Sequence, residues 1–275
     1  MGAAEHFVVK DEKSRTDRAL RLVRRRRFLL CMLAALPAAV WADADWLEPE
    51  WLKIHTIKLT DSRPTHRLVH FTDIHHKGDR AYLERVVTKI NRLSPDAVCF
   101  TGDLIEEAKF VPETLKILEG IKSPLYGVPG NHDYWSHAVF AEIGRSFART
   151  GGAWLLDAQT TLADGKIHLT GVTCLRGQPA ALAPRSGGKN ILLLHYPLMA
   201  ERVRQPFDLL LAGHSHGGQV RIPFYGALML PYWVGKYDMG MFRVPSGRLY
   251  VNPGIGYIGT RLRFNCRPEI TVFEI

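Results

Sequence analysis

Between residues 67 and 216, short apolar runs alternate with segments of helical periodicity. Residues 80–93 place four apolar side chains on one helical face, Leu83, Val86, Val87 and Ile90, and Ser94-Pro95 ends the pattern. By the same reasoning we expect strands at 67–72, 96–101, 125–128, 154–156, 167–173, 191–194 and 208–211, and further helices at 109–120, 136–149 and 198–203. Strands that alternate with helices predict an α/β fold with a largely parallel sheet.

The two ends of this region follow another pattern. Residues 52–59 interleave polar and apolar side chains and are typical of an edge strand. The tail from 220 to 275 is rich in β-branched and aromatic residues punctuated by Gly and Pro, which predicts antiparallel strands near 241–244, 248–251 and 269–273. For the apolar stretch 224–234 we expect packing in the core of the tail, with a substrate wall or membrane-facing loop as the alternative.

Five predicted strands end in side chains that bind metals: Asp73, Asp103, Asn131, His195, and the pair His214 and His216. In open α/β sheets, ligands bind beyond the carboxyl ends of the strands, so we expect these side chains to share one rim. His214 and His216 are two residues apart and therefore point the same way along an extended backbone. Glycines on both sides let backbone approach closely.

Composition excludes some classes of function. The chain has 275 residues and a net charge of +9, but residues 1–30 carry nine Lys/Arg against four acids, so the excess is concentrated there. No basic stripe interleaved with aromatic residues follows, and we expect no nucleic-acid partner. The four cysteines form no CxxC pair, and Cys99 and Cys174 lie in apolar runs typical of buried thiols.

Residues 1–45 are predicted to be a signal peptide or membrane anchor. Arg25-Arg26-Arg27-Phe28-Leu29 resembles a twin-arginine export signal, and Val40-Trp41-Ala42 offers a small-residue cleavage site. The 15 uncharged residues from 28 to 42 fall short of the roughly 20 needed to span a bilayer, and we expect Pro37 to interrupt them, which favours a signal peptide. An uncleaved anchor or an interfacial basic patch is the alternative. Residues 46–66 would form a linker and edge strand, and residues 67–275 a single catalytic domain. We expect the protein to be a monomer.

The ordered motifs Asp73-Ile74-His75, Gly102-Asp103, Gly130-Asn131-His132-Asp133, His195 and Gly213-His214-Ser215-His216 resemble those of the calcineurin-like metallophosphoesterases. Residues 217–223 and 263–270 resemble a bacterial branch of that family. That branch contains twin-arginine-exported phosphodiesterases and membrane-associated enzymes acting on UDP-2,3-diacylglucosamine. The resemblance implies a four-layer αββα sandwich, with mixed sheets inside and helices on the outer faces.

The resemblance also implies two divalent metal ions. One would take Asp73, His75, Asp103 and His216, and the other Asp103, Asn131, His195 and His214, so that Asp103 bridges them. Mixed nitrogen and oxygen ligands suit Mn, Fe or Zn better than Mg or Ca. Ions about 3.5–4 Å apart can share a hydroxide and aim it at phosphorus.

Other residues take supporting roles in this interpretation. His132 matches the family's histidine that is not a ligand and would protonate the leaving group or stabilise its charge. Asp133 would orient the His132 imidazole. His76, Asn265 and Arg267 are candidates for substrate binding, against ordinary surface or structural roles. Glu106 and Glu107 are interpreted as helix N-terminal charges.

These residues predict a dinuclear phosphodiesterase or pyrophosphatase of the bacterial envelope, acting on a small phosphodiester or a nucleotide-linked lipid, with membrane association. The alternatives are a phosphomonoesterase, a UDP-2,3-diacylglucosamine pyrophosphatase of lipid A synthesis if the site faces the cytoplasm, and a metal-dependent binding module without activity.

Overall fold

The computed structural model describes residues 3–175, 177–178 and 182–275. They form two compact units, Met1–Ala44 and Asp45–Ile275. The first unit is one helix, α1 (Ala3–Ala42), which continues through Pro37. Within the described part of the chain, one stretch, Leu20–Glu50, is long and apolar enough by composition to cross a membrane, a property that signal sequences share. The prediction that Pro37 interrupts this segment is wrong, and the choice between signal and anchor stays a prediction.

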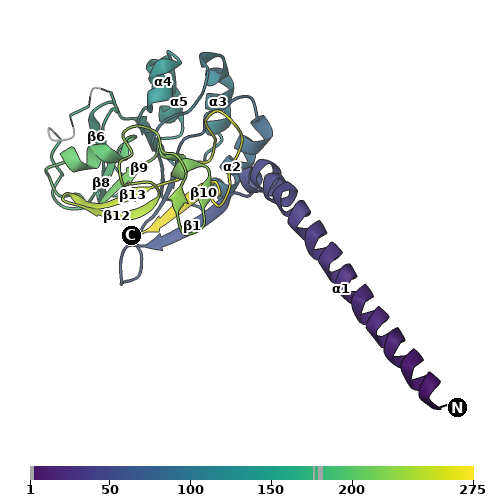
Figure 1. Cartoon of the computed structure of the whole chain (residues 1–275). Coiled ribbons are helices and arrows are strands. Elements are labelled where there is room, and N and C mark those ends of the chain that lie inside the picture. Colours follow the sequence, from purple (N-terminus) through teal and green to yellow (C-terminus); the bar gives the residue numbers. More distant parts are fainter. Residues whose placement is uncertain (1–2, 176, 179–181) are drawn as a thin grey trace. The chain divides into compact units, whose positions relative to one another are not determined.

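The second unit contains two six-stranded sheets (Figure 1). The first sheet has the order β1 (Lys53–Lys58), β14 (Glu269–Glu274), β2 (Arg67–Phe71), β3 (Ala97–Phe100), β4 (Leu125–Gly127) and β5 (Ala153–Trp154). The second has the order β12 (Gly240–Val244), β13 (Gly247–Val251), β9 (Leu209–Ala212), β8 (Lys189–Leu193), β7 (Ile167–Gly171) and β6 (Ala158–Thr161). A short hairpin, β10 (Arg221–Ile222) and β11 (Gly226–Ala227), stands apart from both.

Both sheets are parallel at their centres and mixed at their edges. β2 to β5 pair in parallel, as do β7, β8, β9 and β13. The antiparallel pairs are β14 with β2, β12 with β13, and β6 with β7. The predicted edge strand is β1, which pairs in parallel with β14 through residues such as His55 and Thr271.

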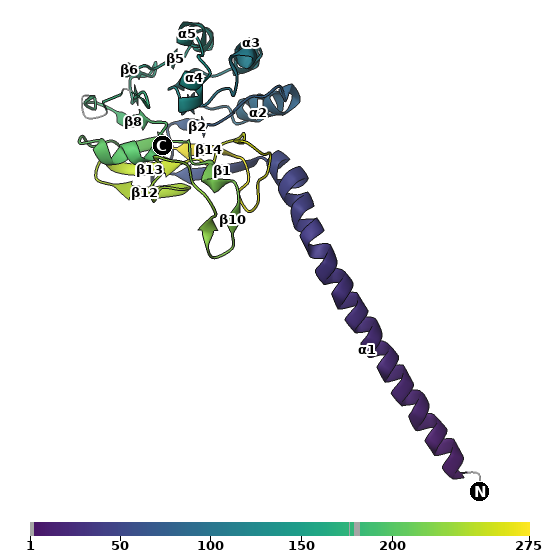
Figure 2. The same cartoon turned by 45° about the horizontal axis from the view of Figure 1, so that its top comes forward.

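In the second unit, the two longest helices are α2 (Arg80–Arg92) and α5 (Phe140–Arg149). Between them lie α3 (Val111–Leu118) and α4 (Asn131–Trp135). In the described residues the other helical elements are a π turn at Asp43–Leu47 and short 3₁₀ helices at Glu48–Glu50, Ala108–Phe110, Pro197–Arg202 and His216–Gly218. Figure 2 shows α2, α3 and α5 together on the same side of the strands.

Successive side chains of a strand point to opposite faces of the sheet, and each face packs against a different layer. Val69 and Phe71 of β2 pack with Leu83 and Val86 of α2, whereas Leu68 lies in the cluster between the two sheets. On the far side of the second sheet, Met199 of the Pro197–Arg202 helix lies in a third buried cluster. The α/β fold with mixed sheets is therefore confirmed, but in the described residues the fourth layer consists of this 3₁₀ helix and loops.

Three local predictions differ from the structure. The helix expected over 136–149 begins at Phe140, and a separate helical turn, α4, starts at Asn131 itself. The helix expected over 198–203 is 3₁₀ rather than α. β6 and the β10–β11 hairpin were not predicted, because their short runs carry too few apolar residues for a clear period.

Candidate metal centre

The seven predicted ligands come together at the carboxyl ends of strands from both sheets. Asp73 and His75 follow β2, Asp103 follows β3, Asn131 follows β4, His195 follows β8, and His214 and His216 follow β9. Two clusters with metal-binding geometry form there: Asp73, His75 and His216, and separately Asp103, His195 and His214. These are the two ligand groups that the resemblance implies, with Asn131 beside the second.

In the first cluster, imidazole nitrogens face one another. Nε2 of His75 lies 3.1 Å from Nε2 of His216, and the latter lies 3.7 Å from Oδ1 of Asp73. The backbone N–H of His214 donates to both oxygens of Asp73, at 3.1 and 2.9 Å. The Asp73 carboxylate is thereby held in place by the loop that carries the two β9 histidines.

The second cluster is centred on Asp103. Its Oδ2 lies 3.3 Å from Nε2 of His195 and 3.4 Å from Nε2 of His75. Nε2 of His195 lies 2.9 Å from Oδ1 of Asn131, and its Nδ1 lies 2.7 Å from the Thr101 carbonyl. One carboxylate oxygen therefore lies beside a histidine from each cluster.

The residues present fit divalent cations. Oδ2 of Asp103, Nδ1 of His214 and Nδ1 of His216 are buried and have no hydrogen-bond partner among the described residues. Nε2 of His214 is engaged by the Tyr232 carbonyl at 2.7 Å, so its unpartnered Nδ1 stays available as a ligand atom. Buried polar atoms are normally hydrogen-bonded, so these orphaned atoms on three predicted ligands indicate missing partners. Carboxylate, amide and imidazole donors together suit a transition metal.

The electrostatics agree with a site for positive charge. Burial alone would raise the pKa of Asp103, but His195 and His75 hold it well below its usual range. Burial lowers the pKa of His75 and His195, yet the neighbouring carboxylates, Asp103 foremost, together outweigh it and raise both to about 9. Burial instead lowers the pKa of His214 to about 3. Cations that bind at this site would compete with protons for the imidazole nitrogens around Asp103.

Backbone strain concentrates in the same loops. Asp73, His75, Asp103, His214 and His216 all have positive φ, between 42° and 68°. Such a conformation is uncommon for residues other than glycine, and it clusters at functional sites where the surrounding structure enforces it. Close packing contributes, because a Cβ on Gly102 would lie 2.7 Å from Nδ1 of His195.

Asp133 does not orient His132 as predicted. Its carboxylate accepts the backbone N–H groups of Asp103, Leu104 and Gly130 at 2.8–2.9 Å. The carboxylate beside the His132 imidazole belongs to Glu106, whose Oε2 lies 3.4 Å from His132 Nδ1. Asp133 therefore fixes the loop of the bridging residue instead of the neighbouring ring.

Glu106 is a site residue that sequence reasoning missed. It precedes the Ala108–Phe110 helix instead of capping it, and Oε2 lies 2.9 Å from Nδ1 of His75. His75, Glu106 and His132 form a third cluster of possible ligand atoms. The sequence signal that could have found Glu106 is its position three residues after Asp103, close to the predicted ligands at the carboxyl ends of the strands. Glu107, in contrast, is exposed and pairs with Lys109.

The three candidate substrate contacts lie elsewhere. The buried His76 ring packs edge-on against Phe110 and lies 3.7 Å from Glu113. Asn265 is exposed at a positive-φ turn, and the backbone N–H of Asn265 donates to Glu48. Arg267 stacks on Trp51 and donates to its carbonyl. In the described structure, these contacts join loops of the domain, so no contact to the metal centre supports their predicted role.

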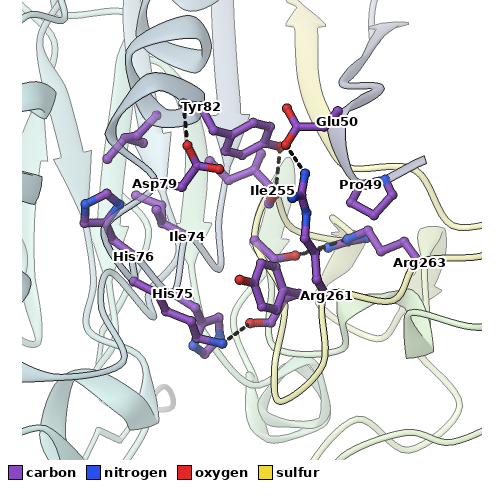
Figure 3. Close-up of a pocket in the computed structure, with 14 residues that line it drawn as sticks. Pro49, Glu50, Ile74, His75, His76, Asp79, Tyr82, Ile255, Arg261 and Arg263 are labelled. Atoms are coloured by element: carbon purple, nitrogen blue, oxygen red, sulfur yellow. Dashed lines mark hydrogen bonds and ion pairs between the residues drawn. The ribbon is translucent and has the colours of Figure 1, made fainter. Parts of the chain in front are cut away.

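Residues around a cavity next to His75 connect the linker, α2 and the loop 253–266 (Figure 3). Arg261 pairs with Glu50 of the linker, and Tyr82 donates to the Ile255 carbonyl at 2.8 Å. Arg263 is buried and donates to the carbonyls of Pro253, Gly254, Gly256 and Cys266. The loop that Arg263 holds in turn donates from the Gly256 N–H to the Asp73 carbonyl at 2.8 Å. Arg263 thus supports the first ligand from behind.

The apolar stretch 224–234 is mostly not core, contrary to prediction. Val234 is buried, but Phe224, Tyr225, Leu228, Met229 and Tyr232 are exposed. Figure 2 shows the β10 hairpin projecting from the strands.

The fold and the site define a phosphoesterase of the metal-dependent class, and comparison with known proteins agrees. The family model for calcineurin-like phosphoesterases matches residues 66–218, more than half of the chain. This chain therefore belongs to the calcineurin-like metallophosphoesterase family and is a hydrolase.

Three curated relatives illustrate the range of that family. The uncharacterized metallophosphoesterase YkuE of Bacillus subtilis is 33% identical, over 91% of this chain and 97% of its own length. Phosphodiesterase YaeI of Escherichia coli is 32% identical over 56% of this chain and 58% of its own length. A transmembrane protein with metallophosphoesterase domain from Danio rerio is 29% identical over 78% of this chain and 54% of its own. The match thus covers nearly all of the first relative and little more than half of the other two.

Proposed function

We propose that this chain is a dinuclear metal-dependent phosphodiesterase of the bacterial cell envelope. The observation that carries the proposal is the position of Asp103 Oδ2, 3.4 Å from His75 and 3.3 Å from His195, with no hydrogen-bond partner among the described residues. A carboxylate oxygen between two ligand clusters is suited to bridge two cations. The name of the E. coli relative, a phosphodiesterase, favours a diester substrate.

Bound divalent ions would supply Lewis acidity, which lowers the pKa of water and neutralises charge on phosphoryl oxygens. The chain's own residues do the rest. Asp73, His75 and His216 would hold one ion, and Asn131, His195 and His214 the other. Nδ1 of His75 is fixed by Glu106, and Nδ1 of His195 by the Thr101 carbonyl, so the Nε2 atoms of both rings face the centre.

His132 is placed to handle the leaving group. Its ring lies edge-on to His75 with centroids 4.5 Å apart, and it is only half-buried. Burial lowers the pKa of His132, whereas the carboxylates of Asp103 and Glu106 act in the opposite direction and favour the protonated ring. A protonated His132 would donate from Nε2 to the departing oxygen.

The proposal is tested with two chromogenic substrates on the full-length chain loaded with Mn²⁺. We expect hydrolysis of bis(p-nitrophenyl) phosphate at a kcat/KM at least tenfold above that for p-nitrophenyl phosphate. Preference for the monoester would make the enzyme a phosphomonoesterase. Hydrolysis of neither substrate, with both ions bound, would make it a binding module.

The envelope location is tested by fusing alkaline phosphatase after residue 60. We expect phosphatase activity outside the inner membrane, which places the catalytic domain there and excludes a UDP-linked lipid of the cytoplasm as substrate. If the alkaline phosphatase fusion is inactive and a cytoplasmic reporter fused at the same residue is active, the catalytic domain faces the cytoplasm. That result would favour UDP-2,3-diacylglucosamine as the substrate.

A further inference from the structure

The loop between β10 and Val234 exposes apolar side chains while its backbone is fixed to the metal centre. Phe224 and Tyr232 are almost fully exposed, and Met229 is 78% exposed. Yet the Tyr232 carbonyl lies 2.7 Å from Nε2 of His214. The next residue, Trp233, stacks on Tyr196 with ring centroids 5.8 Å apart. The exposed apolar side chains thus belong to a loop whose backbone is fixed. An exposed apolar surface that is held in place indicates a binding site.

A cavity of about 230 Å³ lies between this loop and the turn that carries His216. Met229, Leu230, Pro231 and Ile258 supply its apolar lining. The rest of the lining comes from the turn after β9: Ser215, the predicted metal ligand His216, Gly218 and Gln219. Liquid water occupies about 30 Å³ per molecule, so the cavity has room for a chain of several methylene groups.

The lining also excludes other occupants. Apart from His216, no ionisable side chain lines this cavity in the described structure, so a second phosphate would find no other charged partner. The polar groups of Gln219 and Ser215 are already hydrogen-bonded to the backbone, Gln219 to Ile258, Thr260 and Leu262, and Ser215 to Gly217. The loop itself is seated tightly, because a Cβ on Gly218 would lie 2.6 Å from Ala227 Cβ. An apolar pocket with one end at a predicted metal ligand suits a substrate with a phosphate at that end.

We propose that this cavity binds the alkyl or acyl chain of an amphiphilic phosphodiester whose phosphate lies at the metal centre. The inference rests on the proposed phosphodiesterase function and names its substrate class. Burial of each methylene group contributes about 0.8 kcal/mol, roughly fourfold in kcat/KM, until the cavity is filled. The enzyme should therefore distinguish esters by chain length.

The test uses p-nitrophenyl alkyl phosphates from methyl to hexyl, with the Mn²⁺-loaded full-length chain in phosphatidylcholine nanodiscs. We expect kcat/KM to rise at least tenfold from the methyl to the hexyl ester. Met229→Asn and Ile258→Asn, which change lining residues from two different loops, should each reduce the hexyl-to-methyl ratio at least threefold. The control Leu156→Asn changes an exposed leucine away from the cavity and should keep the wild-type ratio.

The outcomes separate the two proposals. Equal rates for methyl and hexyl esters overturn the inference while the diesterase remains. A chain-length gain that both cavity variants retain also overturns it, because partition into the bilayer then explains the gain and the loop is a membrane contact. Failure to hydrolyse any ester, with metal bound, overturns the proposed function itself.

Discussion

Glu106 contacts His75 on the ring nitrogen opposite the one that faces the proposed metals. Oε2 lies 2.9 Å from Nδ1, while Nε2 of the same ring lies 3.1 Å from His216. The same oxygen lies 3.4 Å from Nδ1 of His132. One carboxylate therefore orients a predicted ligand and the predicted proton donor together.

Replacing the Glu106 carboxylate should disturb both the orientation of His75 and the proton donation by His132. We expect Glu106→Gln to lower kcat about 10–100-fold, the usual effect of losing a carboxylate that orients a metal-bound histidine. Its matched control is Glu107→Gln, since Glu107 is exposed and pairs only with Lys109 in the described contacts. Steady-state kinetics with bis(p-nitrophenyl) phosphate checks this, and equal kcat for the two variants would refute the role of Glu106.

His132 should affect turnover but not metal content. The assigned proton donation predicts that His132→Ala lowers kcat by about 10²–10⁴, with two ions still bound by elemental analysis. If His132→Ala loses an ion, His132 is a metal ligand. It would then bind the ion together with His75 and Glu106, whose possible ligand atoms lie close to its own.

Arg263 should be needed for stability. Its guanidinium donates to four backbone carbonyls in a buried site, and each carbonyl left without a donor costs about 1–3 kcal/mol. We expect Arg263→Met to lower the free energy of unfolding by about 3 kcal/mol or more in urea titrations. Arg261→Met is the control. The ion pair of Arg261 with Glu50 is partly exposed, so its loss should cost less than about 1 kcal/mol; equal losses would count against this account.

His70 should make the fold sensitive to acid. Burial lowers its pKa to about 3, although Glu269 opposes this. Below its ordinary pKa of 6.5, the unfolded chain binds a proton that the folded chain does not, so stability falls from about pH 6.5 towards 3. Between pH 7 and 5 we expect wild type to lose up to about 2 kcal/mol more than His70→Gln. Identical pH dependence of unfolding in the two proteins would contradict this.

Much of the site could be predicted because the ligands follow buried strands. Asp73, Asp103 and His195 each stand just beyond an apolar run, and parallel strands bring their carboxyl ends to one edge. The positive φ angles of five ligands could not be predicted, because tertiary contacts impose them.

Contacts between side chains that are distant in sequence could not be predicted from the sequence either. Asp133 is adjacent to His132 in sequence, which suggested a pair, but its carboxylate is used by the backbone after β3. Glu106 reaches two rings only because the loops after β2 and β4 lie on either side of it. For the apolar stretch 224–234, composition alone did not distinguish a core strand from a fixed exposed loop.

The central claim is that one carboxylate, Asp103, joins two metal sites. Elemental analysis of the purified full-length chain, after saturation with Mn²⁺ and removal of free metal, tests it directly. We predict two ions per wild-type chain and fewer than one in Asp103→Asn, because both sites lose a ligand. Two ions retained by Asp103→Asn, or one ion in a fully active wild-type enzyme, would contradict the account.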